Sequence, residues 1–362
     1  MIKKFYSDID VATAARQRIK NIFETAPKVY LSVSGGKDSL VLHDMIFKLC
    51  QTGEIDKSKL TVDFIDEEAI YPCCEDLVKQ MRLQWLSLGV KFIWFCIECR
   101  HHNCFNMLTN DESFICWDRY KRDVWVRQMP PFAVTNDPKF KPRQETYQDF
   151  LKKFHKDGIS LSGVRVSESV QRRNYIGRMV NQQSLYPIYD WTDKDVWRYI
   201  YENNLEIPEA YIFLYQTGAG KNQMRLSQFF SVDTARSLVK MCEYYPHLFD
   251  KICKREPNAY MAMLYFDTEL FRRKTESRKN KTDLDVDYKA KTLELLMDDN
   301  YFVSDVAKQQ QKAYKKAIFK DSALLTPKNY KRIYFALIGG DPKLRELRAI
   351  KTDIISDTYN GR

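Results

Sequence analysis

The chain has 362 residues, of which 44% are hydrophobic and 14% aromatic, and it carries 58 Lys and Arg against 48 Asp and Glu. This length predicts two domains, or one α/β core with a large extension, that fold without disulfides or metals. The aromatic content excludes a disordered or low-complexity chain. No apolar run approaches the roughly 18 residues that cross a membrane, and the opening residues turn acidic where a signal peptide is apolar. We therefore expect a cytoplasmic protein without a membrane partner.

The basic balance, a net charge of +10, allows two interpretations. It favours acidic partners such as nucleotide phosphates or nucleic acid, and it also fits a plain solvated surface. The densest basic segment is 272–281, which fits either a nucleic-acid contact or a polar linker.

The number of cysteines, nine, is odd, which argues against a disulfide framework. Cys96, Cys99 and Cys104 come nearest to metal-ligand spacing. A structural zinc site needs four ligands, however, and a free cysteine is an ordinary core residue. We favour core packing and expect no metal site. The less favoured alternatives are zinc at these three residues and an iron–sulfur cluster at Cys73 and Cys74 with Cys96 and Cys99.

The first third of the chain alternates between two hydrophobic patterns. Short apolar runs predict strands over 28–33, 61–66 and 90–95, and helical spacing predicts helices over 39–47 and 79–88. This alternation predicts an α/β fold with a doubly wound parallel sheet and helices on both of its faces. Ligands of such sheets bind beyond the carboxyl ends of the strands.

The rest of the chain is less regular at first and then helical. Residues 161–165 resume strand character, and 191–201 predict a helix with Thr192 as its N-cap and Asp195 in its first turn. From about residue 228 the pattern is mainly helical. We therefore expect an α/β domain over residues 1–227 with an insertion at about 100–150, and a helical C-terminal region over residues 228–362.

The strongest chemical signal is the segment 34–39, Ser-Gly-Gly-Lys-Asp-Ser, between a predicted strand and a predicted helix. Its glycines allow a tight turn and close approach of the backbone to a phosphate, and the helix start offers unpaired N–H groups. Ser34, Ser39 and Lys37 add hydroxyl and ammonium donors, while Asp38 would orient donors or help to place a metal ion. The Walker spacing is missing, so this is a phosphate-binding loop of another kind.

This segment resembles the PP-loop of the N-type ATP pyrophosphatases and of the adenylyl-sulfate and phosphoadenylyl-sulfate reductases. Three further segments are similar in the same order: Asp66 after the second strand, Gly163 to Ser169 with Arg172, and residues 187–200. The resemblance covers about residues 25 to 225 and implies a PP-loop (HUP-like) fold. A narrower similarity, between Trp117 and Pro130, is to the phage and bacterial IbrA-type coactivator branch of the reductase-like proteins.

One departure from the family changes the expected reaction. The reductases carry a C-terminal Glu-Cys-Gly-Leu-His segment, whereas the last cysteine here is Cys253, so phosphoadenylyl-sulfate reduction is disfavoured. The resemblance then implies an enzyme that cleaves the α–β bond of ATP with Mg²⁺ and adenylates an acceptor. The acceptor would be a nucleic acid or nucleotide, with sulfur transfer as a second step for which Cys73 and Cys74 are the candidates. The alternative is a nucleotide-sensing regulator that acts with a protein or DNA partner and does not turn over.

The resemblance assigns roles residue by residue. Lys37, Asp38 and Arg165 are the expected catalytic residues. The expected nucleotide-binding residues are Ser32, Ser34, Gly35, Gly36, Lys37, Asp38, Ser39, Asp66, Gly163, Arg165 and Arg172.

Overall fold

The computed structural model describes residues 8–106, 113–168, 183–218, 224–226, 228–230, 238, 240–265, 287–341 and 343–360. The chain divides into two compact units, which are Met1–His102 with Phe114–Ala259, and Asn103–Ser113 with Tyr260–Arg362. Each unit is described by itself.

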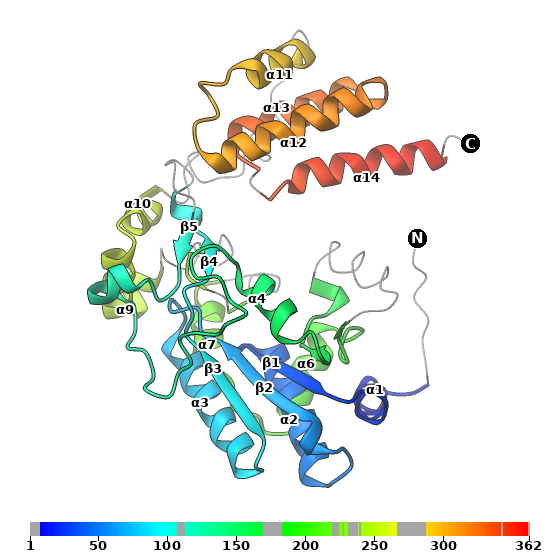
Figure 1. Ribbon diagram of the computed structural model, residues 1–362, viewed down its shortest axis with the longest axis vertical. Coiled ribbons are helices and arrows are strands. Elements are labelled where there is room, and N and C mark those ends of the chain that lie inside the picture. The colour runs from blue at the N-terminus through cyan, green and yellow to red at the C-terminus, as the bar shows by residue number, and fades with distance from the viewer. Residues whose placement is uncertain are drawn as a thin grey trace. The chain divides into compact units, whose positions relative to one another are not determined.

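A five-stranded sheet forms the centre of the first unit, and every pairing in it is parallel (Figure 1). Its residues are largely buried because helices cover both faces, which confirms the predicted doubly wound α/β fold. In sheet order the strands are β3 (Lys91–Phe95), β2 (Leu60–Ile65), β1 (Val29–Val33), β6 (Ile159–Leu161) and β7 (Ser184–Leu185).

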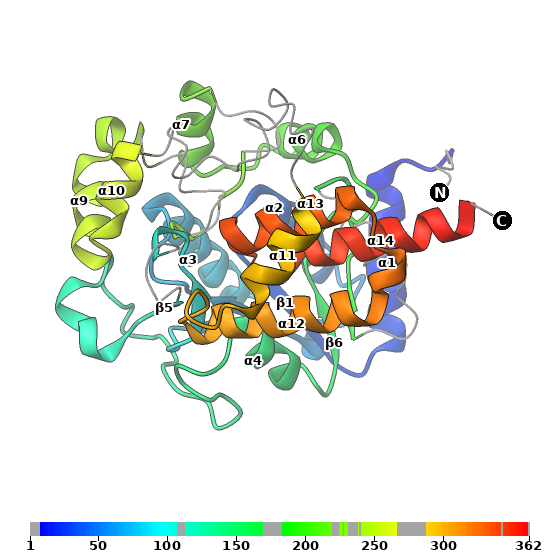
Figure 2. The same ribbon diagram turned by 90° about the horizontal axis from the view of Figure 1, so that it is seen from above.

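Helices lie on both sides of β1: α2 (Lys37–Gln51) on one side and α4 (Tyr147–Phe154) on the other (Figures 1 and 2). The α4 side is aromatic, with the ring centroid of Phe150 5.1 Å from that of Phe95. Beside α2 runs α3 (Pro72–Ser87), which begins well before the predicted residue 79 because Pro72 fits the first turn of a helix. The N-terminal helix is α1 (Val11–Thr25), capped by the Asp10 side chain.

The order of the strands places a switch point at β1, which pairs with β2 on one edge and with β6 on the other. The segments that follow β1 and β6 therefore meet at the carboxyl edge of the sheet, where such folds bind ligands. They meet closely: a Cβ at Gly163 would lie 2.7 Å from the carbonyl carbon and oxygen of Asp38. The strand expected over 161–165 ends at Leu161 for this reason, and the following residues form a loop against the start of α2.

The helix predicted after residue 191 is α6 (Asp193–Glu202), and its expected cap is confirmed. The hydroxyl of Thr192 accepts a hydrogen bond from the Asp195 N–H, and the Asp195 carboxylate accepts one from the Thr192 N–H. The other elements of this unit are η1 (Lys57–Lys59), β4 (Arg100–His102), β5 (Ser113–Ile115, at the border with the second unit), η3 (Arg119–Val124), η4 (Val166–Glu168), α7 (Ala210–Gln216) and α9 (Pro246–Arg255).

The second unit is helical, as the C-terminal pattern predicts. Its core packs Leu296, Tyr314, Ile333 and Leu337 together. Its elements are η2 (Cys104–Asn106), α10 (Asn258–Tyr265, at the border), α11 (Tyr288–Met297), α12 (Asp305–Asp321), η7 (Ser322–Leu324), α13 (Pro327–Gly339) and α14 (Arg345–Asn360).

The main part of the first unit ends at Ala259, and the expected domain boundary at residue 228 stays a prediction. Arg255 on α9 forms a buried ion pair with Glu68 of the sheet unit, with 2.8 Å between Arg255 Nε and Glu68 Oε1. The basic segment 272–281 lies outside the described residues. Within the described ranges, no helix is long and apolar enough to cross a membrane.

Candidate phosphate-binding site

The 34–39 loop joins β1 to α2 and exposes a row of backbone donors. The N–H groups of Gly35, Gly36, Asp38 and Ser39, here called the loop amides, have no hydrogen-bond partner among the described residues. Gly36 is the N-cap of α2 and supplies no side-chain cap, so the positive end of the helix dipole is open. Unpaired amides at a helix start bind anions.

The backbone of the loop is held in shape by two contacts. The Ser39 hydroxyl accepts a hydrogen bond from the Ser34 N–H at 2.9 Å and closes the turn. Gly35 has φ +69°, and a Cβ there would lie 3.1 Å from the carbonyl oxygen of Cys74 at the start of α3. Glycine is therefore required at position 35 both by its conformation and by the close approach of α3.

Two cations and two carboxylates, here called the loop cluster, gather beside the loop amides: Lys37, Asp38, Arg165 and Asp193. Arg165 Nε lies 2.7 Å from Asp38 Oδ1, and Arg165 NH2 lies 2.7 Å from Asp193 Oδ1. Lys37 Nζ lies 3.5 Å from Asp38 Oδ2 and 3.9 Å from Asp193 Oδ1. The Lys37 and Arg165 side chains are only 6% and 2% exposed, while Asp193 is 40% exposed, so the cluster opens to solvent at Asp193.

The structure brings together most of the expected site residues. These are Ser34, Gly35, Gly36, Lys37, Asp38, Ser39, Gly163 and Arg165.

Ser32 lies on β1 before the loop, and its hydroxyl donates a hydrogen bond to Asp63 Oδ2 at 2.9 Å. The other oxygen of this fully buried carboxylate lies 2.8 Å from His155 Nε2. These contacts satisfy a buried charge inside the sheet, and a nucleotide role for Ser32 stays a prediction. Arg172, the remaining cation expected at the phosphates, lies outside the described residues.

Asp66 belongs to a second set of charges, the buried network, which consists of Asp66, Glu68, Glu75, Arg127 and Arg255. The Asp66 carboxylate is fully buried, pairs with Arg127 and accepts hydrogen bonds from the Glu68 N–H at 3.0 Å and from Trp94 Nε1 at 2.9 Å. Burial raises the pKa of this carboxyl and the charge of Arg127 opposes that rise. With its oxygens occupied in this way, a contact of Asp66 with nucleotide remains a prediction.

The sequence pattern missed two residues of the site. Asp193 occupies the first position of α6, beside the Thr192 cap, so the only signal was its place in the family-like segment 187–200. Tyr211 on α7 accepts a hydrogen bond from the Lys37 N–H at 2.8 Å, so this amide is not one of the open loop amides. Nothing in the apolar run around Tyr211 distinguishes it from a core residue, and its distance from the loop in sequence hides the contact.

Cys73 and Cys74 stand at the start of α3, next to the loop. Cys74 is buried and contacts Gly35, whereas Cys73 is half-buried. A hydrogen bond with the Cys74 thiol and one from the Ala210 N–H lower the pKa of Cys73 to about 7, against the opposing effect of burial. The pKa of Cys74 is raised by the same thiol contact and by burial. Cys73 is thus the reactive member of the pair.

Cys96, Cys99 and Cys104 are buried, and burial strongly raises the pKa of Cys96. In the part of the chain that the structure describes, no three side chains of His, Cys, Asp or Glu form a set that could hold a metal ion. A zinc or iron–sulfur centre at these cysteines therefore receives no support from the donor geometry.

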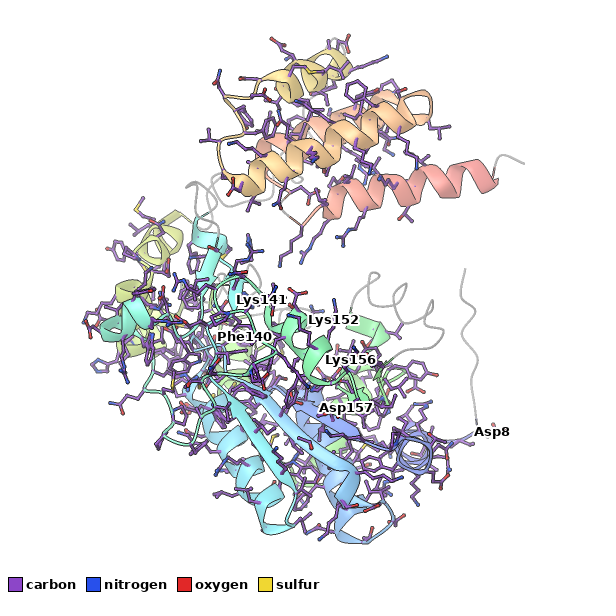
Figure 3. All side chains as sticks on the ribbon, in the orientation of Figure 1. Asp8, Phe140, Lys141, Lys152, Lys156 and Asp157 are labelled. Carbon is purple, nitrogen blue, oxygen red and sulfur yellow. The ribbon has the colours of Figure 1, made fainter. Side chains whose placement is uncertain are left out.

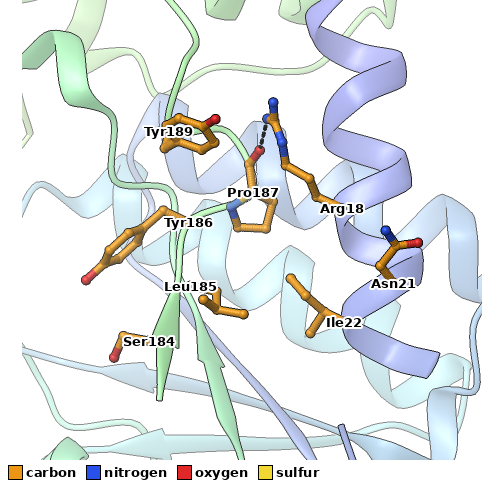
Figure 4. A pocket seen from close by; sticks show the side chains of 8 residues that line it. All are labelled: Arg18, Asn21, Ile22, Ser184, Leu185, Tyr186, Pro187 and Tyr189. Carbon is orange, nitrogen blue, oxygen red and sulfur yellow. Dashed lines mark hydrogen bonds between the residues drawn. The ribbon is translucent and has the colours of Figure 1, made fainter. Parts of the chain in front are cut away.

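A cavity of about 350 Å³ lies away from the loop, between α1 and β7 (Figure 4). The Arg18 guanidinium crosses one side of it and donates a hydrogen bond to the Pro187 carbonyl at 2.8 Å. Its remaining lining is mostly apolar and none of the 34–39 loop contributes, so it is separate from the phosphate site.

A parallel sheet with a glycine loop at its switch point, open amides and buried cations is typical of an α/β protein of the PP-loop class. The chain belongs to the family of the phosphoadenosine phosphosulfate reductase domain, whose sequence profile matches residues 28–221. The narrower resemblance to the IbrA-type branch stays a prediction.

Known proteins similar to this chain are distant. The uncharacterized protein YbdN of Escherichia coli K12 is 28% identical over an alignment of 266 residues. The alignment covers 66% of this chain and 63% of YbdN, so the chain spans less than two thirds of that relative. An FMN adenylyltransferase from Candida glabrata, solved with FMN and an ATP analogue, is 16% identical over 58% of this chain and 64% of that chain, with a TM-score of 0.32. The phosphoadenylyl-sulfate reductase from Candida auris, solved as a phosphate complex, is 17% identical over 60% and 89% of the two chains, with a TM-score of 0.32.

Proposed function

We propose that this protein binds ATP at the 34–39 loop, cleaves the bond between its α and β phosphates, and transfers AMP to an acceptor. The observation that carries the proposal is the row of loop amides at the open start of α2. Four free N–H groups bind anionic oxygens without any rearrangement of the backbone. The buried cations Lys37 and Arg165 stand beside them.

In the proposed step an acceptor oxygen attacks the α-phosphorus. The new P–O bond forms while the bond to the β-phosphate oxygen breaks, so pyrophosphate leaves with the electron pair and the acceptor proton passes to solvent. Lys37 and Arg165 offset the charge that develops on pyrophosphate. Asp38 contacts both cations and therefore holds them in position.

ATP carries Mg²⁺ on its phosphates, and this ion prefers carboxylate and phosphate oxygens. Asp193 is the member of the loop cluster whose carboxylate reaches solvent, so it is the residue we assign to that ion. The ion would add to the charge stabilisation that the two cations supply.

For the acceptor we propose a nucleic acid that docks on exposed lysines around α4, here called the lysine surface (Figure 3). A depression of about 530 Å³ on this surface is bordered by Lys139, Lys153, Lys156 and Asp157. The lysine surface consists of four exposed lysines for which no ion pair with a described residue is seen: Lys139, Lys141, Lys152 and Lys156. The nearby carboxylates do not pair with these lysines, since Glu145 pairs with Lys153 and Asp149 caps α4. Such cations bind a phosphate backbone.

If the acceptor is thiolated, Cys73 is the residue that we assign to the sulfur step. A persulfide on Cys73, supplied by a sulfur donor, attacks the adenylated carbon, so that a C–S bond forms and AMP leaves with the electrons of the C–O bond. An external thiol then cleaves the S–S bond, forms a mixed disulfide with Cys73 and releases the thiolated acceptor. The low pKa of Cys73 and its place beside the loop support this role.

The decisive experiment follows ATP labelled at the α-phosphate, with water, an RNA oligonucleotide or a DNA oligonucleotide as acceptor. The wild-type protein should release AMP or labelled acceptor together with pyrophosphate. Lys37→Ala should reduce that release by about 100-fold or more, because a donor to the developing charge is lost. The matched control is Lys91→Ala, an exposed lysine at the opposite end of the sheet, which should turn over normally.

Binding of ATP by the wild-type protein without cleavage for any of these acceptors would contradict the adenylation reaction. That result would favour the nucleotide-sensing alternative. Cleavage that survives Lys37→Ala would contradict the site.

A further inference from the structure

Tyr211 lies beside the loop amides and has no role in the proposed reaction. Its ring comes from α7, and its hydroxyl oxygen sits at the first turn of α2, 2.8 Å from the Lys37 N–H that donates to it. The hydroxyl also lies 3.6 Å from the position of a Cβ at Gly36, and the Ser34 hydroxyl lies 3.7 Å from that position. Two hydroxyl groups thus border the space above the N-cap of α2.

The hydroxyl of Tyr211 is both an acceptor and a donor, and only the acceptor is used. No described residue accepts a hydrogen bond from its O–H, although the side chain is 97% inaccessible, with a relative exposure of 3%. A buried donor without a partner is unfavourable, so such a group in a native fold needs an explanation.

The ring of Tyr211 packs against side chains of α6 and α2. Trp197 of α6 packs edge-on against it with ring centroids 5.6 Å apart, and Lys37 Nζ lies 5.6 Å from its centroid. Burial strongly raises the pKa of Tyr211, so the phenol keeps its proton at neutral pH and remains a donor. The hydroxyl is therefore held at the loop, beside the space that Gly36 and the Ser34 hydroxyl border.

We propose that Tyr211 is a phosphate-binding residue, whose O–H donates to an oxygen of the phosphate group that the loop amides hold. This assignment rests on the proposed nucleotide function and extends it to α7. It also gives a role to the hydrogen bond from the Lys37 N–H, because that bond holds the hydroxyl beside the ligand. The ligand class is a pyrophosphate or the polyphosphate of an adenine nucleotide.

The test measures binding of inorganic pyrophosphate and of the ATP analogue AMPCPP by titration calorimetry, with thermal unfolding of the free protein alongside. Tyr211→Phe should weaken both ligands by about tenfold, the usual effect of one hydrogen bond to a charged group. The matched control is Tyr215→Phe, one turn further along α7 and 75% exposed, which should bind normally. A merely structural tyrosine would lower the unfolding temperature and leave both affinities unchanged, and this result would overturn the assignment.

Gly36→Ala gives a second measurement in case Tyr211→Phe does not fold. Gly36 has φ −89°, which alanine adopts without strain, and its methyl group would stand between the two hydroxyls. We expect weaker pyrophosphate binding here too, and unchanged affinity would contradict the assignment. A wild-type protein that binds neither ligand would overturn the nucleotide function itself, whereas wild-type binding that Tyr211→Phe leaves intact would overturn only the role of Tyr211.

Discussion

The loop cluster and the buried network are both sets of opposite charges drawn from distant segments to the carboxyl edge of one sheet. In the buried network, Glu68 and Asp66 are inaccessible, and each carboxylate accepts hydrogen bonds from arginine and from backbone or indole N–H groups. The loop cluster instead stands beside four amides without a described partner and opens to solvent at Asp193. We therefore expect the buried network to stabilise the fold, because its carboxylates are fully hydrogen-bonded, and the loop cluster to face a ligand.

The hydrogen bonds of the buried network hold distant segments of the chain together. Glu68 has φ +65°, a conformation that residues other than glycine rarely adopt, and Trp117, Val126 and Arg255 all donate to its carboxylate. These donors tie the insertion and α9 to the end of β2. An incomplete set leaves donors for a ligand, so we expect changes in the network to lower stability and changes in the cluster to lower activity.

The largest expected effect is on Arg255. Arg255→Met leaves the Glu68 carboxylate buried without its main partner, so the free energy of unfolding should fall by about 3 to 5 kcal/mol. Urea denaturation measures it. The neighbouring Lys254→Met is the control, since Lys254 is 65% exposed and should change stability little. An equal loss of unfolding free energy in both variants would show that the buried network does not stabilise the fold.

Arg165 makes the opposite case. Arg165→Met should reduce pyrophosphate release by about 100- to 1000-fold, because a cation at the developing charge is lost. Its effect on the free energy of unfolding should be smaller than that of Arg255→Met, since the Asp38 and Asp193 carboxylates retain contact with solvent. Normal turnover with a large loss of stability would place Arg165 with the network instead.

His43 is a buried polar side chain outside both sets of charges, and it too should affect stability. His43 accepts a hydrogen bond from Trp85 Nε1 at Nδ1 and lies 3.0 Å from Gln84 Oε1, and burial lowers its pKa to about 4. The unfolded chain, with a histidine pKa near 6.5, then binds the proton first as pH falls. Stability is therefore complete above pH 6.5 and should decline by about 3 kcal/mol as pH drops towards 4.

The measurement is urea unfolding of the wild type and of His43→Gln from pH 7 to pH 4. The variant lacks this titration, so the gap between the two curves should narrow as pH falls. Parallel curves over that range would contradict the low pKa of His43.

The smallest effect concerns the open side of the loop. With a pKa of about 7, Cys73 should react with iodoacetamide about tenfold faster at pH 8 than at pH 6, with the half-maximal rate near pH 7. Cys253, whose pKa burial raises to about 11, is the internal control and should remain slow, as peptide mass spectrometry can follow. AMPCPP should protect Cys73 if the loop and the thiol share one site. Labelling of both cysteines at the same rate would contradict the difference.

Sequence reasoning succeeded where neighbouring residues act together. The strands, the loop between β1 and α2 and the Thr192 cap each depend on residues a few positions apart, so local patterns predict them. It missed Tyr211 because its role depends on a contact across 174 positions. For Asp66 the sequence alone could not show that Arg127 and Trp94 surround its carboxylate.

By itself, the sequence determined the alternation of strands and helices, the phosphate-binding loop and the family to which they point, because periodicity, glycine and capping are local properties. The tertiary structure alone decided which charged groups have all their hydrogen bonds within the protein and which lie beside donors that a ligand can use. It brought Arg165 and Asp193 to the loop, placed the Tyr211 hydroxyl at the Lys37 N–H and enclosed Glu68 between Arg255 and Trp117. The physical reason is that hydrogen-bond satisfaction depends on the whole packed environment of an atom, which no local stretch of sequence contains.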